Sequence, residues 1–246
     1  MNEAPPPPCG NDWALFLDLD GTLLELAATP GAVQVSDRLL RVLLALRERL
    51  DDAVALVTGR SITEIDRLLG LSDLAVAGIH GGERRDAAGR VHRLSTDSGI
   101  DEARRALAAF AMSHPGLLLE DKGSALALHF RLAPGMEPAA RAAVAQALAA
   151  SGPGYEVQAG KRVLEIKPLG ASKGRAIEQF MAEPPFAGRV PAFVGDDLTD
   201  EPGFDVVNRM NGCSVRVGAA DGSRARWTLP DVARVLDWLE SPCDPR

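Results

Sequence analysis

The sequence predicts an α/β fold, in which helices cover a parallel β-sheet and a smaller α+β module is inserted. Three observations support this prediction. Short apolar runs alternate with segments of helical periodicity before residue 98 and again after residue 168. Acidic or hydroxyl side chains follow several of these runs, at the edge of a parallel sheet where ligands bind. Between residues 98 and 167 a helix followed by two short strands occurs twice.

The composition indicates a folded protein with a sizeable core. The 246 residues are 46% hydrophobic, enough for one large domain or two smaller ones. The net charge of −7 and the pI near 5.2 argue against nucleic-acid or membrane partners, because an acidic protein repels a polyanion. No apolar run reaches the roughly 20 residues that span a bilayer. We expect a cytoplasmic monomer whose partner is a small molecule.

The N-terminal residues 1–12 are predicted to form a flexible, Pro-rich tail. Four consecutive prolines, Pro5 to Pro8, favour an extended chain without internal hydrogen bonds. The cysteines are too few and too far apart for a disulfide framework or a zinc site, so we expect free thiols. They are Cys9, Cys213 and Cys243.

Residues 13–97 are predicted to form the first part of the larger domain. A buried strand ends at Asp18, and a helix capped by Ser36 extends to about Leu50. Five leucines are expected on the buried face of this helix: Leu39, Leu40, Leu43, Leu44 and Leu50. Next come a strand over 53–57, a short helix whose Ser61 and Glu64 have capping-box spacing, and a strand over 74–79.

Residues 98–167 are predicted to form the inserted module. Helices over 101–112 and 138–150 are each followed by two short strands, an order typical of a small antiparallel sheet with helices beside it.

The larger domain resumes over 168–246. It is predicted to contain a helix that begins at Ser172, a strand over 190–194, a helix near 201–210 and a strand over 213–217. A last helix has one apolar face, with Val232, Val235, Leu236 and Leu239.

The strongest candidates for chemistry are Asp18 and Asp20, in the stretch LFLDLDGTL. They end an apolar run and precede Gly21-Thr22. A carboxylate in the crevice above a parallel sheet can attack phosphorus and become an aspartyl-phosphate, and a second one nearby can act as acid and then base. Taken alone, the pattern also fits a strand that ends in a polar turn.

Two further segments could bind a phosphoryl group. Thr58-Gly59-Arg60 supplies a hydroxyl and turn amides, although a threonine at a strand end is more often structural. Lys173 stands at the start of a predicted helix, where a cation is disfavoured unless an anion is near. By itself that pattern favours a solvated lysine.

A fourth segment, GDDLTDE over 195–201, crowds carboxylates directly after an apolar strand. Such crowding is unfavourable unless a hard cation shares the charge, and an oxygen-rich site of this kind suits Mg²⁺. The alternative is an acidic helix start, where aspartate is common.

In this order the four segments resemble the four motifs of the haloacid dehalogenase superfamily of phosphotransferases. The resemblance implies a Rossmann-like core that uses Mg²⁺, with Asp18 as nucleophile and Asp20 as general acid and then base. It implies that Thr58 and Lys173 bind the transferred phosphoryl group. The inserted module then corresponds to a cap that determines substrate specificity.

The same resemblance implies a metal site. Asp196 would be a ligand beside Asp18 and the backbone carbonyl of Asp20, with Asp197 and Asp200 in support. Whether Asp196 or Asp197 is the direct ligand is left open by the sequence.

The predicted cap strands carry charged side chains that could bind sugar hydroxyls, although their spacing also fits a solvated sheet face. Together with the stretches GIHG at 78–81 and GDDLTDE at 195–201, these strands resemble the trehalose-6-phosphate phosphatases. The similarity extends from about Trp13 to Leu239. That resemblance implies a phosphoric monoester hydrolase that converts trehalose 6-phosphate to trehalose and phosphate in trehalose synthesis. It also implies a substrate-binding set: Gly59, Arg60, His80, Glu120, Lys122, Arg131 and Glu165.

Other functions stay open. A phosphatase for another sugar phosphate, such as sucrose 6-phosphate, would need the same core chemistry. A non-catalytic sugar-phosphate-binding module is disfavoured, because every residue of the four motifs is present. A phosphomutase fits the core motifs but not the cap.

Overall fold

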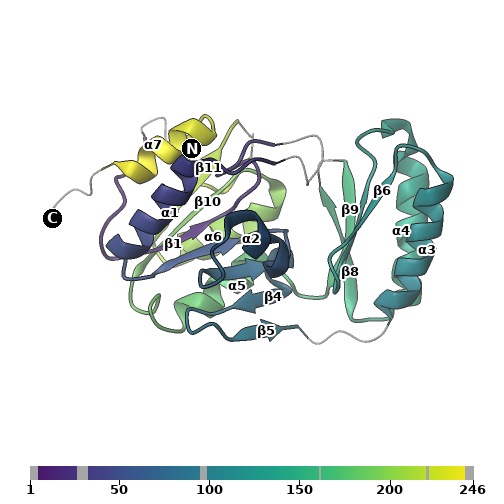
Figure 1. The fold of residues 1–246 in the computed structure, drawn as a ribbon, viewed down its shortest axis with the longest axis horizontal. Helices are drawn as coiled ribbons and strands as arrows, with labels where there is room; N and C mark the ends of the chain where they lie inside the picture. The colour runs from purple at the N-terminus through teal and green to yellow at the C-terminus, as the bar shows by residue number, and fades with distance from the viewer. Residues whose placement is uncertain (1–4, 27–32, 95–98, 161, 220–221, 242–246) are drawn as a thin grey trace. The chain divides into compact units, whose positions relative to one another are not determined.

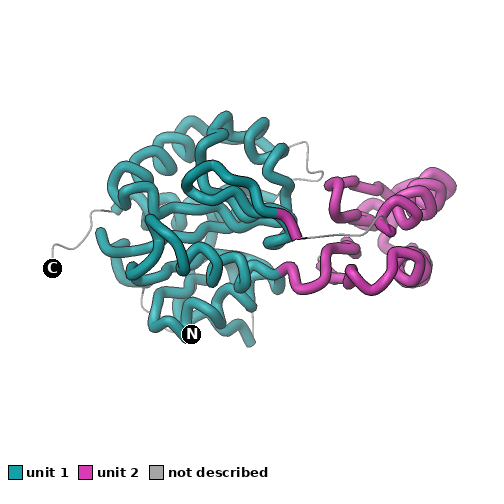
Figure 2. The backbone as a smooth tube through the Cα atoms, turned by 90° about the horizontal axis from the view of Figure 1, so that it is seen from below, with its two compact units in different colours: residues 1–92, 172–246 teal, residues 93–171 magenta. Residues whose placement is uncertain are grey.

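The computed structural model describes residues 5–26, 33–94, 99–160, 162–219 and 222–241. The chain divides into two compact units, residues 1–92 with 172–246 (unit 1) and residues 93–171 (unit 2), shown in Figure 2. Within the described ranges, no helix is both long and apolar enough to cross a membrane.

Unit 1 is built on an eight-stranded sheet in the order β12-β11-β10-β1-β2-β3-β4-β5 (Figure 1). Its strands are β1 Trp13–Leu17, β2 Val54–Val57, β3 Ala75–Gly78, β4 Glu83–Arg85, β5 Val91–Arg93, β10 Val190–Gly195, β11 Cys213–Val217 and β12 Trp227–Leu229. Strands β12 to β3 pair in parallel, and β4 is antiparallel to β3. The apolar runs of β1, β2 and β3 are buried throughout, as expected for a parallel sheet covered on both faces.

The centre of this sheet is a topological switch point. β1 lies between β2 and β10, so the chain moves in one direction along the sheet after β1 and in the other after β10. Leu17 is the partner of Val194 in the register, and the Asp18 N–H donates to the Val194 carbonyl at 2.9 Å. A crevice for ligands forms at the carboxyl ends of strands at such a point.

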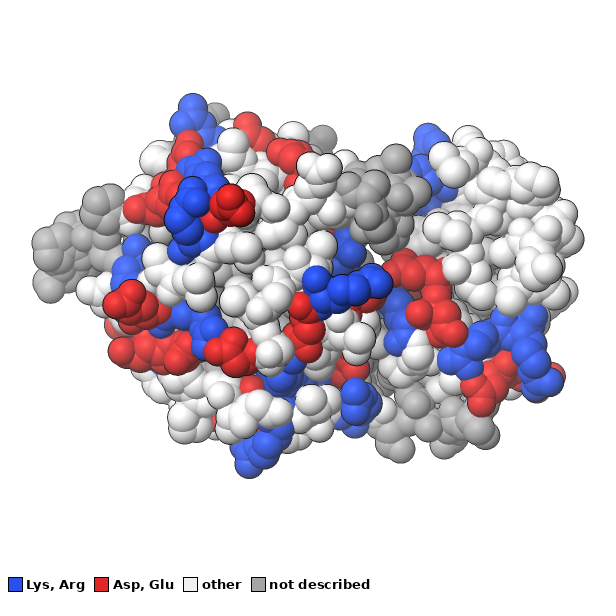
Figure 3. All heavy atoms as spheres, viewed as in Figure 1, with Lys and Arg blue, Asp and Glu red and all other residues white. Residues whose placement is uncertain are grey.

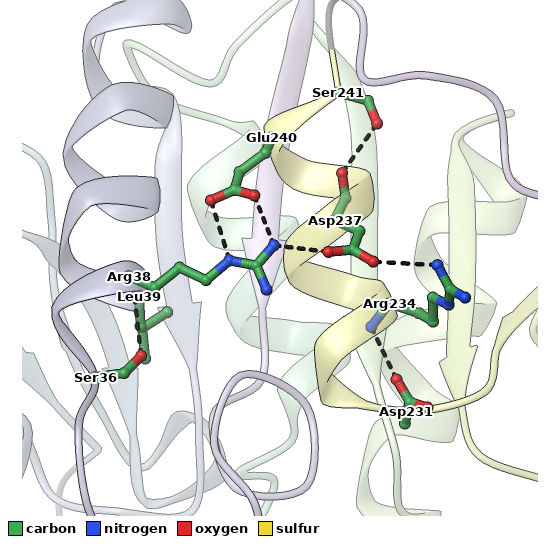
Figure 4. A network of polar contacts seen from close by, with 8 residues as sticks. All are labelled: Ser36, Arg38, Leu39, Asp231, Arg234, Asp237, Glu240 and Ser241. Carbon is green, nitrogen blue, oxygen red and sulfur yellow. Dashed lines mark hydrogen bonds and ion pairs between the residues drawn. The ribbon is translucent and has the colours of Figure 1, made fainter.

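In the described part of unit 1, five α-helices cover the sheet. They are α1 Asp37–Arg49, α2 Ile62–Leu69, α5 Lys173–Met181, α6 Glu201–Arg209 and α7 Val232–Glu240. α1 packs beside α7, and α5 packs beside α6. In Figure 4, Arg38 on α1 joins α7 through Asp237 Oδ1 at 2.7 Å and Glu240 Oε2 at 2.6 Å. These ion pairs are partly exposed, so each contributes little to stability.

The helix starts confirm the predicted caps at Ser36 and Ser61, and the predicted helix that opens at Ser172 is capped in the same way. The hydroxyls of Ser36, Ser61 and Ser172 each accept a hydrogen bond from the first turn of their helix, and Ser61 forms a capping box with Glu64.

One leucine of α1 that was predicted to be buried is exposed. Leu44 is 49% exposed, whereas Leu46 is buried with Leu39 and Leu43. Five residues after Leu39, position 44 falls on the opposite side of a helix with 3.6 residues per turn.

Strands β4, β5 and β12 were not predicted. β4 consists of charged residues, Glu83, Arg84 and Arg85, and all three are buried. Arg85 Nη2 lies 2.7 Å from Asp66 Oδ1, Arg84 pairs with Glu183, and the Glu83 carboxylate accepts from the Ile62 N–H. Paired charges therefore replace the apolar side chains by which a buried strand is usually identified.

Residues 5–12, assigned by the sequence to a flexible tail, contact the core of unit 1. Pro6 and Cys9 are buried. Trp238 Nε1 donates to the Pro7 carbonyl at 2.9 Å, and the Trp238 ring centroid lies 6.2 Å from that of Trp13. Cys9 and Cys213 are thiols, as expected, and Cys243 lies outside the described residues.

Charges of both signs are interspersed on the surface of unit 1 seen in Figure 3. Within unit 1, Arg47 pairs with Asp52 at 2.7 Å and with Asp73 at 3.0 Å. Pairing of this kind breaks up fields of a single sign.

Unit 2 is a separate α+β unit. Its antiparallel sheet has the order β6-β7-β9-β8, with β6 Leu118–Asp121, β7 Leu126–His129, β8 Tyr155–Gly160 and β9 Val163–Pro168. The two helices, α3 Ile100–Ser113 and α4 Glu137–Ser151, pack against each other. Together the helices and one face of the sheet enclose a core that includes Leu107, Leu126, Leu128, Val144 and Ile166.

Candidate active site

Three charged side chains form the buried centre of the site. Asp18 follows β1, Lys173 is the first residue of α5, and Asp200 ends the short 3-10 helix Leu198–Asp200 that follows β10. Lys173 Nζ lies 2.7 Å from Asp18 Oδ1 and 2.6 Å from Asp200 Oδ1. Lys173 is only 2% exposed, so the interpretation as a solvated lysine is wrong: two carboxylates supply the anions that its position requires.

A group of carboxylates suited to a metal ion lies in the same place. One oxygen from each of Asp18, Asp196 and Asp200 falls within 4.8 Å of the others. The second Asp200 oxygen accepts hydrogen bonds from the N–H groups of Asp196 and Asp197, at 3.0 and 2.9 Å. Asp200 therefore fixes the loop that carries Asp196. The described structure does not place the Asp197 carboxylate in this group.

Two glycines leave room for these carboxylates. Gly21 has φ +83°, and a Cβ there would overlap the Asp196 carboxylate. A Cβ on Gly195 would overlap Asp200. Carboxylate oxygens close together on rigid strand ends are the ligand set that a hard divalent cation prefers, so the residues present fit such an ion.

Three carboxylates lie close together at this centre, and two of them pair with the ammonium group of Lys173. Burial raises the pKa of the Asp18 carboxyl, Lys173 opposes this, and the charges of Asp200 and Asp196 raise it further, so that the pKa lies well above its usual value. Burial alone would lower the pKa of Lys173, but Asp18 and Asp200 outweigh burial and raise it. A divalent cation would offset the remaining charge.

The second carboxylate of the first motif faces a different partner. Asp20 forms a bidentate ion pair with Arg60, with Nε 2.6 Å from Oδ2 and Nη2 2.7 Å from Oδ1. Thr58 is buried, and its hydroxyl accepts from the Arg60 N–H at 3.2 Å. The loops after β1 and β2 are thereby joined.

The loop after β3 completes this side of the site. The His80 N–H donates to the Thr58 carbonyl at 2.9 Å, and the Ile79 N–H to the Arg60 carbonyl at 3.0 Å. Ile79 and His80 have φ of 51° and 52°, a left-handed conformation that is unusual for such residues and costs conformational energy. The His80 ring lies over Gly59, where a Cβ would come within 2.7 Å of Cε1 and Nε2. The structure thus brings Thr58, Gly59, Arg60 and His80 together.

In unit 2, charged side chains gather on the sheet face opposite the core. The register aligns Glu120 with Ala127 and Ala127 with Glu165, and Lys122 Nζ lies 3.4 Å from Glu165 Oε1. We call this the polar face and define it by Glu120, Lys122, His129, Glu165 and Lys167. The side chains of Lys122 and Glu165 are 8% and 7% exposed, so they do not form a fully solvated sheet face.

Arg131, a predicted site residue, lies outside the polar face, and His129, which was not predicted, belongs to it. Arg131 lies two positions beyond the end of β7 and is exposed. His129 was not among the predicted site residues, yet its Nε2 lies 2.7 Å from Glu120 Oε2. The two-residue alternation of β7, which puts His129 on the face of Ala127, is the sequence signal that could have identified it.

The sequence of this chain matches a known protein family. The trehalose-phosphatase family matches residues 16–232, which is most of the chain. The chain belongs to the trehalose-phosphatase family. A probable trehalose-phosphate phosphatase of Sinorhizobium fredii is 46% identical, over 90% of this chain and 84% of the relative. The trehalose-6-phosphate phosphatase of Escherichia coli is 45% identical, over 93% and 85%.

Solved structures confirm the fold predicted for this trehalose-phosphatase family member. A trehalose-6-phosphate phosphatase related protein superposes with a TM-score of 0.79 at 27% identity, over 92% of this chain and 95% of that one. A phosphatase of the haloacid dehalogenase superfamily from Bacteroides thetaiotaomicron has the same fold, with a TM-score of 0.58 at 18% identity over 91% of each chain. The predicted class of enzyme, a phosphatase acting on a sugar phosphate, is likewise confirmed by the family.

Proposed function

We propose that this chain hydrolyses trehalose 6-phosphate to trehalose and phosphate in the cytoplasm, as a monomer and with Mg²⁺. The single observation that carries the proposal is the ion pair between Asp18 and Lys173 at the switch point of the sheet. It places a nucleophile beside a cation that can bind the phosphoryl group. The names of the relatives at 45% and 46% identity support the choice of sugar.

In the first step, the Asp18 carboxylate attacks phosphorus, and the bond from phosphorus to the sugar oxygen breaks. Asp20 donates a proton to that oxygen, which leaves as trehalose. Lys173 and Thr58 hold the phosphoryl oxygens during the transfer, while the amides around Gly59 and Arg60 orient them. The product of this step is an acyl phosphate, in which a carboxyl oxygen of Asp18 is bonded to phosphorus.

In the second step, water attacks phosphorus. Asp20, now a carboxylate, accepts a proton from this water, and the bond from phosphorus to the Asp18 oxygen breaks. Phosphate leaves, and Asp18 and Asp20 return to their starting states. The buried position of Asp18 favours direct transfer to this carboxylate because few water molecules can compete in the first step.

We further propose that Asp18, the backbone carbonyl of Asp20 and Asp196 would hold Mg²⁺. Asp197 and Asp200 would support them, since both Asp200 oxygens are already engaged by Lys173 and by the loop amides. When bound, the cation would offset repulsion between the anionic nucleophile and the anionic ester.

We assign recognition of the sugar to unit 2, as a cap whose polar face binds hydroxyl groups. Glu120 and Glu165 would accept hydrogen bonds, and Lys122 and Arg131 would donate them. We assign His80, beside Gly59, to contact with the substrate near the phosphate.

The test is phosphate release by the purified protein from trehalose 6-phosphate, glucose 6-phosphate and sucrose 6-phosphate, each with Mg²⁺ and with EDTA. We expect a strong preference for trehalose 6-phosphate that EDTA abolishes. Equal rates on all three esters would overturn the substrate assignment and leave the nucleophile in place. Sugar-phosphate binding without phosphate release would instead favour a non-catalytic module.

A further inference from the structure

We propose that His129 is a positioning residue for sugar recognition, which holds the Glu120 carboxylate in one orientation on the polar face of unit 2. The proposal rests on the proposed function, because it concerns the sugar that this face would bind. In this role His129 acts through Glu120 and contacts neither the phosphate nor Asp18.

The register of the sheet places His129 beside Glu120. β6 and β7 are antiparallel, with Leu118 opposite His129 and Glu120 opposite Ala127. His129 and Glu120 are therefore diagonal neighbours on the same face, within reach of each other's long side chains. His129 Nε2 lies 2.7 Å from Glu120 Oε2, and the side chains are 23% and 17% exposed. A contact this short between largely buried groups is a directed hydrogen bond.

The other neighbours of Glu120 do little to hold its carboxylate in place. Its neighbours on the middle strand, Ala125 and Ala127, have no polar side-chain atom that could fix a carboxylate. Glu165 stands beyond Ala127, where its negative charge opposes that of Glu120. His129 Nε2 is hydrogen-bonded to Glu120 Oε2, and the charge of Lys122 also attracts this carboxylate. The hydrogen bond with the imidazole therefore gives this carboxylate a defined direction.

The charge state of Glu120 agrees with an acceptor role. Burial raises the pKa of its carboxyl, but the hydrogen bond from His129 and the charge of Lys122 outweigh burial, and the pKa is lowered overall. With Oε2 engaged by His129, Oε1 can accept a hydrogen bond from a sugar hydroxyl. A carboxylate already held in place loses little conformational freedom when the sugar binds, and this improves affinity.

The effect should appear in KM for the sugar ester and not in kcat. Full-length H129L, which lacks the donor, should raise KM for trehalose 6-phosphate about three- to tenfold, because the Glu120 side chain must then be ordered when the sugar binds. Its kcat should stay within about twofold, because His129 does not touch the reacting atoms. H129Q, whose side-chain amide can donate to Glu120, should restore most of the affinity.

The matched control is His114, the other histidine of unit 2. Its Nδ1 lies 2.8 Å from the Phe110 carbonyl at the end of its own helix. H114L should leave KM unchanged. p-Nitrophenyl phosphate, which has no sugar, reports on unit 1 alone, and its KM should not change in any of these variants.

A double-mutant cycle with E120Q completes the test. If His129 acts through Glu120, H129L should add little to the KM of E120Q. An unchanged KM in H129L, or a full additional loss in the double variant, would overturn the proposal while the wild type still hydrolyses trehalose 6-phosphate. An equal rise in KM for p-nitrophenyl phosphate would overturn it too, as a general structural effect. Wild-type protein inactive on trehalose 6-phosphate would overturn the proposed function, and this proposal with it.

Discussion

Arg60 engages both carboxylate oxygens of Asp20, through Nε and Nη2 at 2.6 and 2.7 Å. Two parallel hydrogen bonds from one guanidinium fix a carboxylate in a single plane. In this state Asp20 is a double acceptor. The proposed acid role therefore requires the ion pair to open before Asp20 donates a proton to the leaving oxygen.

Replacement of Asp20 by Asn separates the two steps of the reaction. We expect kcat on trehalose 6-phosphate to fall by about 10²- to 10⁴-fold, the usual contribution of a general acid and base. p-Nitrophenolate leaves without a proton, so D20N should still release a rapid burst of it before slow turnover. Stopped-flow absorbance measures this burst. A D20N enzyme with no burst, but with the fold of the wild type, would contradict the assignment.

Replacement of Asp18 by Asn should abolish turnover and the burst alike, because no nucleophile remains. The same variant should be more stable than the wild type without divalent cations. The pKa of Asp18 is raised in the folded state, so its ionised form destabilises the metal-free fold at neutral pH.

The stability gain from D18N should depend on pH, because the pKa of Asp18 is raised in the folded state. The gain from D18N should be full above the folded-state pKa of Asp18 and should shrink as pH falls toward about 4, where Asp18 in the unfolded chain is protonated as well. Thermal unfolding in EDTA at several pH values measures this. Residual turnover in D18N, or a constant stability difference at all pH values, would count against this account.

Gly21→Ala should weaken cation binding. The added methyl group would overlap the Asp196 carboxylate, in addition to the strain of φ +83°. We expect the Mg²⁺ concentration for half-maximal activity to rise at least tenfold, and the thermal shift on addition of Mg²⁺ to shrink.

Gly89→Ala is the matched control for this change. Gly89 has φ +80°, and a Cβ there would meet nothing within 4 Å. G89A therefore carries the backbone strain alone, about 1 kcal/mol, and should leave the Mg²⁺ requirement unchanged. Equal Mg²⁺ requirements for the two variants would mean that strain, and not the crowding of Asp196, is responsible.

Trp238→Phe should lower the melting temperature by about 2–4 °C without changing KM. The variant keeps an aromatic ring beside Trp13 but leaves the Pro7 carbonyl without its donor, at a cost of about 1 kcal/mol. Deletion of residues 1–8 should cause a loss of similar size or larger. If neither change alters the melting temperature, the contact of this segment with the core does not stabilise the fold.

Hydrophobic periodicity predicted most elements of both units, because most of their strands and helices bury apolar side chains. It missed β4, where Arg84 and Arg85 are buried through partners distant in sequence. It also missed the docking of residues 5–12, which depends on Trp238 at the other end of the chain. Contacts between distant positions leave no periodic signal within a short window.

The site was predictable to a similar extent. Motif order placed Asp18, Thr58 and Asp196 at neighbouring strand ends, where the structure has them. The burial of Lys173 between two carboxylates was not evident from its local pattern, which suits a solvated lysine equally well. The pairing of His129 with Glu120 required the register of β6 on β7, which only the folded sheet defines.

The pairing of β1 with β10 also sets an order of events during synthesis. Trp13 and Val190 are partners in the register, although the whole of unit 2 lies between them in the chain. Unit 2 has a core of its own, so it can fold as soon as residue 171 has left the ribosome. The central sheet must wait for β10, and Asp18 meets Lys173 and Asp200 only after that. A truncated or stalled chain would therefore carry a folded unit 2 but no assembled cluster of Asp18, Lys173 and Asp200.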